Sequence, residues 1–591
     1  MVKIIISHTT HVQQILPTKN NDTEPPYFLQ PNGTAKSILN WSNNADLDTN
    51  QKKAFEIICS SFILSFYNEA ALNSAAELPL FEKEKSKLKL LVGTTISKNK
   101  QLICFLHGPA GSGKSTVLEI IRTYAKAFCD FISPHLYDKK VIVITAMTGV
   151  AATMIQGETT HSALYLNQKK RFEADQIETW EATKLVIIDE ISFSRSTDIE
   201  KIHANLTQLK QTTYKKFGGL NIVFCGDMRQ LEPVDKKPIY DDNVHQFKSW
   251  INCYITLNGL HRFKEDPKWG KLLKRFRDGT VTEKDIKKIN TRVVTNELSL
   301  PKNIKYATYD NASRDAINTA LFCKRCKNNT KNPALYRTTM IIFANEFKIK
   351  NRNKTMTKFK NPKLIWELCG EDDIKVAQRQ GRMDPVLKLY IGCPMMIPYN
   401  INVSAGIANG TQCILKQIVL KPDTFIQNVT IENEITVQAV FASDVTSIIL
   451  EHSNPQENMP KQFQIVPKKY TFKLHAKPKT QLYNKTVDEN ENPAQMTALQ
   501  LPILVNNATT GHKLQGSSVH SLFVNQWNYS KNWPYVLLSR VKTIDGLHLR
   551  TPLSTDLEHY NVPEKLTEMI QHIEKFLPVP LSKTVYNQLK L

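Results

Sequence analysis

Residues 108–115 read G-P-A-G-S-G-K-S and match the phosphate-binding pattern G-x-x-x-x-G-K-[ST] at every fixed position. Glycines let the backbone curl so that successive N–H groups point inward, and the start of a helix adds partial positive charge. Lys114 would supply a full positive charge and Ser115 a magnesium ligand. The pattern predicts a nucleoside triphosphate site made of Gly108, Pro109, Ala110, Gly111, Ser112, Gly113, Lys114, Ser115 and Thr116.

Two adjacent carboxylates, Asp189 and Glu190, follow the apolar run 185–188. At the end of a strand they could divide the work of hydrolysis, with Asp189 holding the magnesium shell and Glu190 polarising the attacking water. An exposed Asp-Glu pair at a strand end is common by itself. Downstream of a complete phosphate-binding loop it favours the catalytic interpretation.

The elements that must position these groups are short apolar runs at 102–106, 141–144, 185–188 and 221–225, with a helical pattern after residue 116. Such runs are typical of buried parallel strands, whose carboxyl ends hold the ligands of open α/β sheets. The loops 145–152 and 157–162 would lie at those ends, although each could be an ordinary connection. The sequence therefore predicts an α/β fold.

A candidate for recognition of the base is Gln51, which follows a cap-like Asp-Thr-Asn segment at the start of a predicted helix. An amide placed just before the phosphate-binding domain can bind an adenine edge. A capping or surface glutamine is the more common alternative.

The composition suits a large protein that binds a polyanion. The chain has 591 residues, enough for several domains, and 77 Lys and Arg against 55 Asp and Glu give a net charge of +22. This surplus favours nucleic acid through counterion release, although a merely basic protein is the alternative. The 10 cysteines show no disulfide framework, and the single C-x-x-C, at Cys323 and Cys326, lacks the second pair that a zinc site needs. Without a run that could span a bilayer, we expect a soluble intracellular protein with no membrane partner.

After the Asp189-Glu190-Ile191-Ser192 segment, residues 226–234 read G-D-M-R-Q-L-E-P-V. This series resembles the PIF (petite integration frequency) helicases, in the RecD-like branch of superfamily 1. Further motifs follow in the family's order at 257–263, 406–411, 510–516 and 535–541. The resemblance extends from about residue 47 to 549.

The resemblance implies roles for individual residues. Gln51 would contact adenine, Lys114, Ser115, Asp189 and Glu190 would bind and hydrolyse ATP with Mg²⁺, and Gln230 would sense the γ-phosphate. Arg262 and Arg540, from the second motor domain, match the family's arginines that contact the γ-phosphate. The family's DNA-facing loops correspond here to Thr148, Gly149, Thr160, His161, His512 and Lys513.

Six positions depart from the family pattern: Met147, the pair Met228-Arg229, Glu232 and the pair Thr510-Gly511. None removes a residue expected to touch ATP. Glu232 adds negative charge near a polyanion track and Gly511 loosens a loop. These changes are expected to affect DNA binding and the coupling of ATP hydrolysis to movement along DNA.

The fold implied by the resemblance has two RecA-like P-loop domains with a small wedge and an inserted SH3-like β-barrel. We predict a loosely ordered arm at 1–45, domain 1A at 46–250 with the wedge at 163–183, and the first part of domain 2A at 251–390. Alternating apolar runs predict the barrel at 391–500, and 501–591 would complete domain 2A and end in an amphipathic packing helix at 564–573. ATP would lie in the cleft between the two domains.

The function implied is an ATP-dependent DNA helicase that moves 5′-to-3′ on single-stranded DNA and unwinds forked DNA. The family works in DNA replication, repair, recombination or telomere maintenance, in the nucleus or mitochondrion of eukaryotes, and we expect a monomeric motor. One alternative is a DNA-stimulated ATPase that binds or remodels nucleic acid without processive unwinding. A second is an unrelated P-loop enzyme such as a nucleotide kinase.

Overall fold

The computed structural model describes residues 34–590. It leaves out 71–77, 94–95, 97–100, 133–134, 169, 234–236, 242–245, 296–299, 302, 330–337, 352–353, 360–383, 403–404, 432–434, 454, 456–458, 475–493, 531 and 580–582. The chain forms two compact units. The first comprises Met1–Lys287, Tyr529–Ile544 and Ser554–Leu591, and the second comprises Lys288–Asn528 and Asp545–Leu553.

The first unit is built on a six-stranded parallel sheet in the order β3-β2-β4-β5-β1-β6. All four strands predicted from apolar runs are present in it. The strands are β1 (Ile103–His107), β2 (Ile142–Ala146), β3 (Glu158–Thr159), β4 (Leu185–Asp189), β5 (Asn221–Gly226) and β6 (Cys253–Thr256). The central strands β1, β4 and β5 are buried at every position, as expected when helices cover both faces of a parallel sheet.

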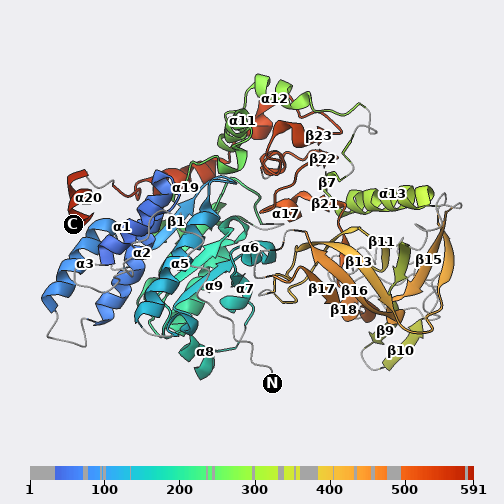
Figure 1. The fold of residues 1–591 in the computed structure, drawn as a ribbon, viewed down its shortest axis with the longest axis horizontal. Coiled ribbons are helices and arrows are strands. Elements are labelled where there is room, and N and C mark those ends of the chain that lie inside the picture. Colours follow the sequence, from blue (N-terminus) through green and yellow to red (C-terminus); the bar gives the residue numbers. More distant parts are fainter. Residues whose placement is uncertain are drawn as a thin grey trace, which may run out of the picture. The chain divides into compact units, whose positions relative to one another are not determined.

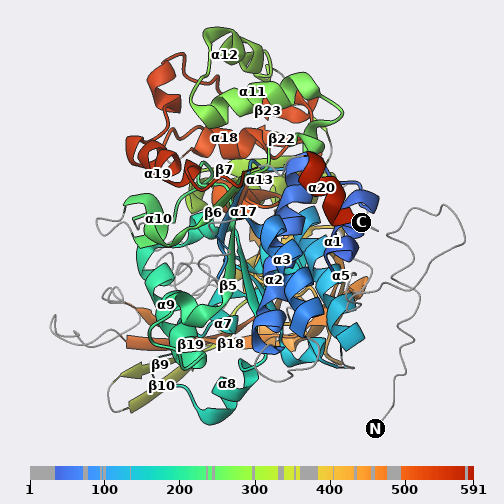
Figure 2. The same ribbon diagram turned by 90° about the vertical axis from the view of Figure 1, so that its left-hand side faces the viewer.

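Helices cover the two faces of this sheet, with α2 and α5 to one side and α9 to the other (Figure 2). The core on the α9 side includes residues of β1, β4 and β5 together with α9 and α19. The helices of this unit are α1 (Thr34–Asn44), α2 (Thr49–Ala70), α3 (Leu78–Val92), α5 (Lys114–Ile132), α6 (Gly149–Met154), α7 (Thr160–Ala163), α8 (Ala174–Thr179), α9 (Ser196–Leu209), α10 (Gln246–Trp250), α11 (Pro267–Asp278), α18 (Trp533–Leu538), α19 (Glu564–Glu574) and α20 (Lys583–Lys590). Helix α12 (Glu283–Asn290) crosses the boundary at Lys287.

The structure corrects two sequence-based boundaries. The predicted loose arm is wrong over 34–44, because α1 buries Ala35, Ile38 and Leu39; residues 1–33 lie outside the described residues. The C-terminal helix was assigned to domain 2A, yet α19 buries Leu566 and Ile573 in the core of the first unit. Its predicted packing role is confirmed.

The second unit contains a smaller parallel sheet in the order β21-β7-β22-β23. Its strands are β21 (Ala508–Thr510), β7 (Lys305–Thr308), β22 (Leu522–Val524) and β23 (Leu547–Leu549), and helices α13 (Asn311–Asn329) and α17 (Gly511–Leu514) pack against β21. Cys323 and Cys326 are buried in the core beneath α13. Among the described residues, no group of three or more His, Cys, Asp or Glu side chains is placed to hold a metal ion.

The remaining strands of this unit form three further sheets, ordered β10-β9-β19-β18, β11-β8-β15-β14 and β17-β16-β13-β12-β20 (Figure 1). The strands are β8 (Thr339–Phe343), β9 (Asn345–Asn351), β10 (Lys354–Phe359), β11 (Val386–Tyr390), β12 (Pro394–Met396), β13 (Gln412–Leu420), β14 (Gln427–Ile431), β15 (Ile435–Phe441), β16 (Val445–His452), β17 (Gln462–Ile465), β18 (Lys468–Leu474), β19 (Ala494–Gln500) and β20 (Leu504–Val505). The β-strands predicted within 391–500 are present, but the sheets that the structure describes do not close into a barrel. No described helix has the length and apolar character needed to span a bilayer.

Candidate nucleotide-binding site

The phosphate-binding loop connects β1 to α5, as its sequence context predicts. Gly111 and Gly113 have φ of +79° and +86°, a left-handed conformation that strains any residue with a Cβ. The Gly108 N–H donates to the Gly226 carbonyl at 3.2 Å, which anchors the loop to the end of β5. Ser115 and Thr116 are exposed in the first turn of α5. The loop therefore has the shape of an anion cradle at the start of a helix.

Lys114 lies over this loop. Its ammonium group donates to the carbonyl oxygens of Gly108 at 2.7 Å and Pro109 at 3.1 Å. These bonds hold the charge at the mouth of the cradle, where it also interacts electrostatically with Asp189. The side chain is thus placed as the phosphate-binding interpretation requires.

The two carboxylates end β4 beside this lysine. Burial and the neighbouring Glu190 raise the pKa of Asp189 to about 7, and Lys114 partly opposes that rise. The Glu190 N–H donates to Asp189 Oδ1 at 2.9 Å, and Glu190 takes a left-handed φ of +53°. Carboxylate oxygens are the hard ligands that Mg²⁺ prefers, and a bound divalent cation would compensate the charge of a buried carboxylate. These residues therefore fit Mg²⁺.

Gln230 follows β5 and is buried, with 3% of its surface exposed. Its Oε1 has no hydrogen-bond partner among the described residues, and the Ser112 Oγ of the phosphate-binding loop is in the same condition. Buried polar atoms are normally paired, so each such atom needs an explanation. An unpaired buried amide oxygen suits acceptance of a hydrogen bond from a water molecule.

Gln51 reaches the loop from α2. Its Nε2 donates to the Ser112 carbonyl at 3.3 Å, and its Oε1 accepts from the Asp48 N–H at 2.8 Å. A Cβ built on Gly113 would come within 1.9 Å of Gln51 Nε2, so the absence of a side chain there admits the amide. The ring of His261 lies 3.4 Å from the same nitrogen and 3.2 Å from Asp48 Oδ2.

Both predicted arginines lie in the same compact unit as the loop, whereas the resemblance assigned them to the second motor domain. The reason is packing: Arg262 Nη1 donates to the Ser539 carbonyl at 3.2 Å, and Trp269 Nε1 donates to the Val541 carbonyl at 3.2 Å. These bonds join the 3-10 turn His261–Phe263 and α11 to the segment that carries Arg540.

Arg540 is fully buried, and its guanidinium donates to the Val536 carbonyl at 2.8 Å and to Ser539 Oγ at 2.7 Å. Burial and the nearby Arg262 lower the pKa of Arg540 to about 9, while Glu190 acts in the opposite direction. Burial likewise lowers the pKa of Arg262, against the influence of Tyr535 and Glu190. The two guanidinium groups interact with each other and with the Glu190 carboxylate. They form a positively charged region that suits phosphate oxygens.

A buried charged cluster that sequence reasoning missed lies behind the loop. Asp227 Oδ2 accepts from Arg277 Nε at 3.0 Å, His107 Nε2 lies 3.0 Å from Arg277 Nη2, and the Tyr535 hydroxyl donates to Asp227 Oδ2 at 3.3 Å. Arg277 holds the pKa of Asp227 well below its usual range, although burial acts to raise it. The one available signal was the charged Arg277 on the otherwise apolar face of α11.

The loops proposed to face DNA in this unit follow β2 and β3. Thr148 caps α6, accepting from the Ala151 N–H at 3.2 Å. The Thr160 hydroxyl is buried and donates to Thr145 Oγ1 at 3.1 Å, and Gly149 is also buried. The side chains of Thr148 and Thr160 therefore have structural contacts, and both Thr148 and His161 are partly exposed. In the second unit, His512 and Lys513 lie in α17 and are partly exposed.

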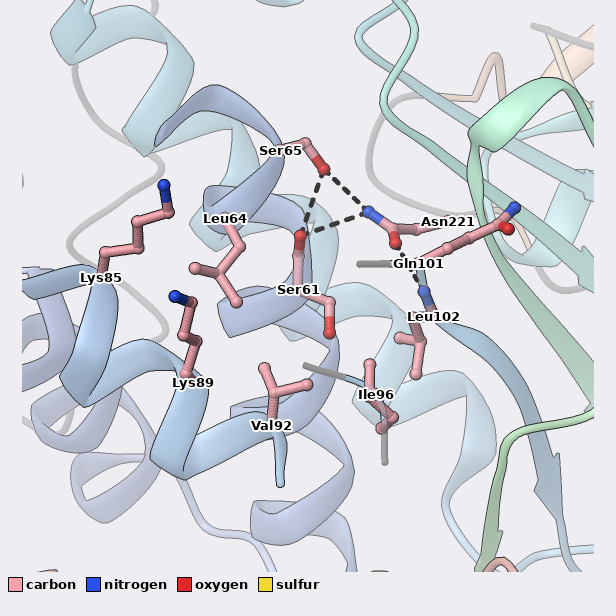
Figure 3. A pocket seen from close by; sticks show the side chains of 10 residues that line it. All are labelled: Ser61, Leu64, Ser65, Lys85, Lys89, Val92, Ile96, Gln101, Leu102 and Asn221. Carbon is pink, nitrogen blue, oxygen red and sulfur yellow. Dashed lines mark hydrogen bonds between the residues drawn. The ribbon is translucent and has the colours of Figure 1, made fainter. Parts of the chain in front are cut away.

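The wedge segment 163–183 contains α8, which is followed by the buried core residue Trp180. Its basic patch includes Lys170 and Arg171, and Lys169 lies outside the described residues. Elsewhere, a cavity of about 90 Å³ opens between α2, α3 and the starts of β1 and β5 (Figure 3). Asn221 crosses it and donates to Ser65 Oγ at 2.9 Å. This cavity is far below the size of a ligand pocket and lies at the strand ends opposite the loop.

Comparison with known proteins assigns the segment around the loop. Residues 79–287 match the family model described as PIF1-like helicase. This segment is similar in sequence to the PIF1-like helicases. The chain is 29% identical over 212 residues to the ATP-dependent DNA helicase PIF1 of Saccharomyces cerevisiae, which covers 33% of this chain and 24% of that protein. It is 24% identical over 352 residues to PIF1 of Danio rerio, covering 57% of this chain and 47% of that protein.

The fold of the chain is also similar to that of solved Pif1 structures. A crystal structure of Bacteroides Pif1 bound to ssDNA matches with a TM-score of 0.53 and 19% identity, over 81% of this chain and 95% of that one. At this identity the match shows the α/β fold alone. The chain spans about a quarter to a half of the length of the two curated relatives, so activity and substrates are inferred separately.

Proposed function

We propose that this protein is an ATP-dependent DNA helicase that moves along single-stranded DNA and unwinds duplex DNA. The observation that carries the proposal is that Lys114, the Asp189-Glu190 pair and both arginines interact electrostatically within one compact unit. That set provides a phosphate anchor, cation ligands and positive charge. The PIF1-like match over 79–287 supports the same reaction.

Each residue has a role in hydrolysis. Gln51 would read the adenine edge, Ser115 and Asp189 would hold Mg²⁺, and Glu190 would orient the attacking water. Bound Mg²⁺ neutralises charge on the phosphate oxygens. Arg262 and Arg540 would stabilise the charge that develops on the transferred phosphate, a contribution worth about 10³–10⁵ in rate for such arginines.

The DNA side of the proposal rests on charge and on the relatives. A net charge of +22 favours binding to a polyanion. His161 in the first unit and His512 with Lys513 in the second are partly exposed on the loops that match the family's DNA-facing motifs. The Pif1 structure bound to ssDNA supports a single strand as the track. The same proposal includes travel in the 5′-to-3′ direction. It also includes an SH3-like insert, formed by the β-rich segment of the second unit, that lies over the DNA.

The competing function is a DNA-stimulated ATPase that does not unwind. It is favoured by Glu232, whose carboxylate is bonded to the Tyr240 hydroxyl and stands where the family has proline. Both functions predict stimulation of hydrolysis by single-stranded DNA, and strand displacement separates them. A nucleotide kinase would instead hydrolyse or transfer phosphate without regard to DNA.

The test is ATP hydrolysis by the full chain and by Lys114→Ala, with and without single-stranded DNA. We expect DNA to stimulate the natural protein and Lys114→Ala to lose hydrolysis while it keeps most of its DNA affinity. Retained turnover in Lys114→Ala, or turnover indifferent to DNA, would contradict the proposal.

A further inference from the structure

The buried cluster behind the loop joins four separate parts of the first unit. His107 ends β1, Asp227 follows β5, Arg277 lies near the end of α11 and Tyr535 lies in α18. Asp227 is fully buried and Arg277 is 8% exposed. The Arg277 guanidinium contacts Asp227 through both Nε and Nη2, with Nε 3.2 Å from Oδ1 and 3.0 Å from Oδ2, and Nη2 3.0 Å from Oδ1. The planar fork of arginine suits this two-pronged contact and a lysine could not reproduce it.

Tyr535 connects this ion pair to the phosphate-binding loop. Its hydroxyl donates to Asp227 Oδ2 at 3.3 Å and also shares a hydrogen bond with the backbone of Ala110. The ring is 4% exposed, so water does not replace these partners. One hydroxyl group thus links the residue after β5 to the third residue of the loop.

The same helix determines where Arg540 lies. Arg540 donates to the Val536 carbonyl at 2.8 Å, one residue beyond Tyr535, and its own N–H donates to the Leu537 carbonyl at 3.0 Å. A change in the seating of α18 therefore moves the Arg540 guanidinium with it. Catalytic groups must be held close to their productive geometry, and second contacts of this kind supply that precision.

A second branch reaches the loop that carries Gln230. Arg229 Nη1 donates to the Arg277 carbonyl at 3.3 Å and to Asp278 Oδ1 at 2.7 Å. The Gln230 N–H donates to the Asp227 carbonyl at 3.0 Å. The ion pair and its neighbours therefore contact the segments that bear both Gln230 and Arg540.

We propose that Asp227 and Arg277 are positioning residues for ATP hydrolysis. Their ion pair orients Tyr535, whose hydrogen bond to the Ala110 backbone fixes the position of α18 and therefore of Arg540. The inference rests on the proposed ATPase function and deepens it. None of the three residues touches the nucleotide in this scheme. They act through Arg540 and Gln230, so they affect the rate of the chemical step more than the affinity for ATP.

Tyr535→Phe is the mildest test, since it keeps the ring and removes the hydroxyl alone. We expect kcat for DNA-stimulated hydrolysis to fall about 10-fold or more, the usual range for losing a hydrogen bond to a charged group. The Kd for ATP, measured by titration of a fluorescent analogue, should stay within about two-fold because the phosphate cradle is intact. Tyr560→Phe is the matched control, because this buried tyrosine donates to the Ser554 carbonyl at 2.7 Å outside the cluster.

A double-mutant cycle tests the connection between Asp227 and Tyr535. If the carboxylate acts through the hydroxyl, Asp227→Asn in the Tyr535→Phe background should lower kcat by less than it does in the natural protein. Arg277→Lys, which keeps the charge and loses the fork, should reproduce the fall in kcat with Kd unchanged.

The inference is overturned if Tyr535→Phe keeps kcat within about two-fold of the natural protein, or if Tyr560→Phe loses as much. It is also overturned if the fold-reduction of kcat in the double variant equals the product of the reductions caused by Asp227→Asn and Tyr535→Phe alone. Lys114→Ala in the same assay separates this inference from the proposed function. Loss of turnover in Lys114→Ala with a fully active Tyr535→Phe removes the positioning role alone, whereas retained turnover in Lys114→Ala removes the proposed function as well.

Discussion

Gly111 of the phosphate-binding loop lies against Arg262. A Cβ built on Gly111 would approach the Arg262 Cβ to 2.3 Å, closer than two such atoms can come, and the φ of +79° adds backbone strain. The absence of a side chain at Gly111 thus allows the predicted arginine to stand directly over the loop. This contact ties the phosphate cradle to the positively charged region of the two arginines.

Gly111→Ala should weaken ATP binding at least 10-fold, because either the loop or the Arg262 backbone must shift. The left-handed φ alone should cost about 1–2 kcal/mol of unfolding free energy. Gly392→Ala is the control, since Gly392 has φ of +87° and open space around its would-be Cβ. Titration with a fluorescent ATP analogue measures the affinity, and chemical denaturation measures the stability. Equal ATP affinity in the two variants would contradict the contact.

Arg262→Ala should lower kcat by about 10³-fold, with a smaller effect on ATP affinity, because the guanidinium is expected to stabilise the transition state. Arg275→Ala is the control, since Arg275 of α11 pairs with Asp285 of α12. Steady-state hydrolysis with saturating single-stranded DNA measures the effect. If both variants retain the same kcat, Arg262 is a structural arginine.

Particular residues show how far the sequence could be interpreted. The phosphate-binding loop, its flanking strand and helix, and the four central strands follow from local spacing, because a parallel strand buried on both faces must be apolar throughout. Gln51, Arg262 and Arg540 were found through the order of motifs. Their contacts could not be predicted, because each depends on segments far apart in the chain.

The errors have the same origin. The resemblance implied that Arg540 belongs to the second domain, whereas it lies in the first unit, where Trp269 bonds to the neighbouring Val541 carbonyl. The buried ion pair of Asp227 and Arg277 was missed because a charged residue on a helix usually reads as solvated surface. Helix α1 was missed because its sequence is rich in Asn and Ser, and its burial depends on contacts with α2 and α20.

The stability of the first unit should depend on pH through His107. Burial lowers the pKa of His107 to about 4, helped by Arg277 and Lys114 and opposed by Asp227. The folded state therefore resists protonation while the unfolded chain binds a proton below about pH 6.5, so stability falls on acidification between pH 6.5 and 4. His107 should account for a loss of about 2 kcal/mol between pH 7 and 5.

Denaturant unfolding of the natural protein and His107→Gln at pH 7 and 5 measures this contribution. Between pH 7 and 5, His107→Gln should lose about 2 kcal/mol less unfolding free energy than the natural protein does. This difference should hold whatever the stability of the variant at pH 7. His135→Gln is the control, because His135 is an exposed residue. An identical pH dependence in the natural protein and His107→Gln would show that His107 does not titrate as inferred.

Lys513→Ala should weaken binding to single-stranded DNA and reduce its salt dependence. One phosphate contact contributes about 0.7 to the slope of log K against log salt concentration on a single strand. Lys416→Ala, which removes a lysine paired with Glu451 at 3.3 Å in the same unit, should leave the slope unchanged. Fluorescence anisotropy over a salt series measures both slopes, and equal slopes would remove Lys513 from the DNA contact.

The central claim is that hydrolysis at the loop drives unwinding, and strand displacement tests it most directly. Two forked duplexes that differ in which strand carries the long single-stranded tail would be offered to the natural protein and to Lys114→Ala. We predict ATP-dependent displacement by the natural protein from the duplex with the 5′ tail, little from the 3′ tail, and none by Lys114→Ala. DNA-stimulated hydrolysis without displacement of either duplex would contradict the account.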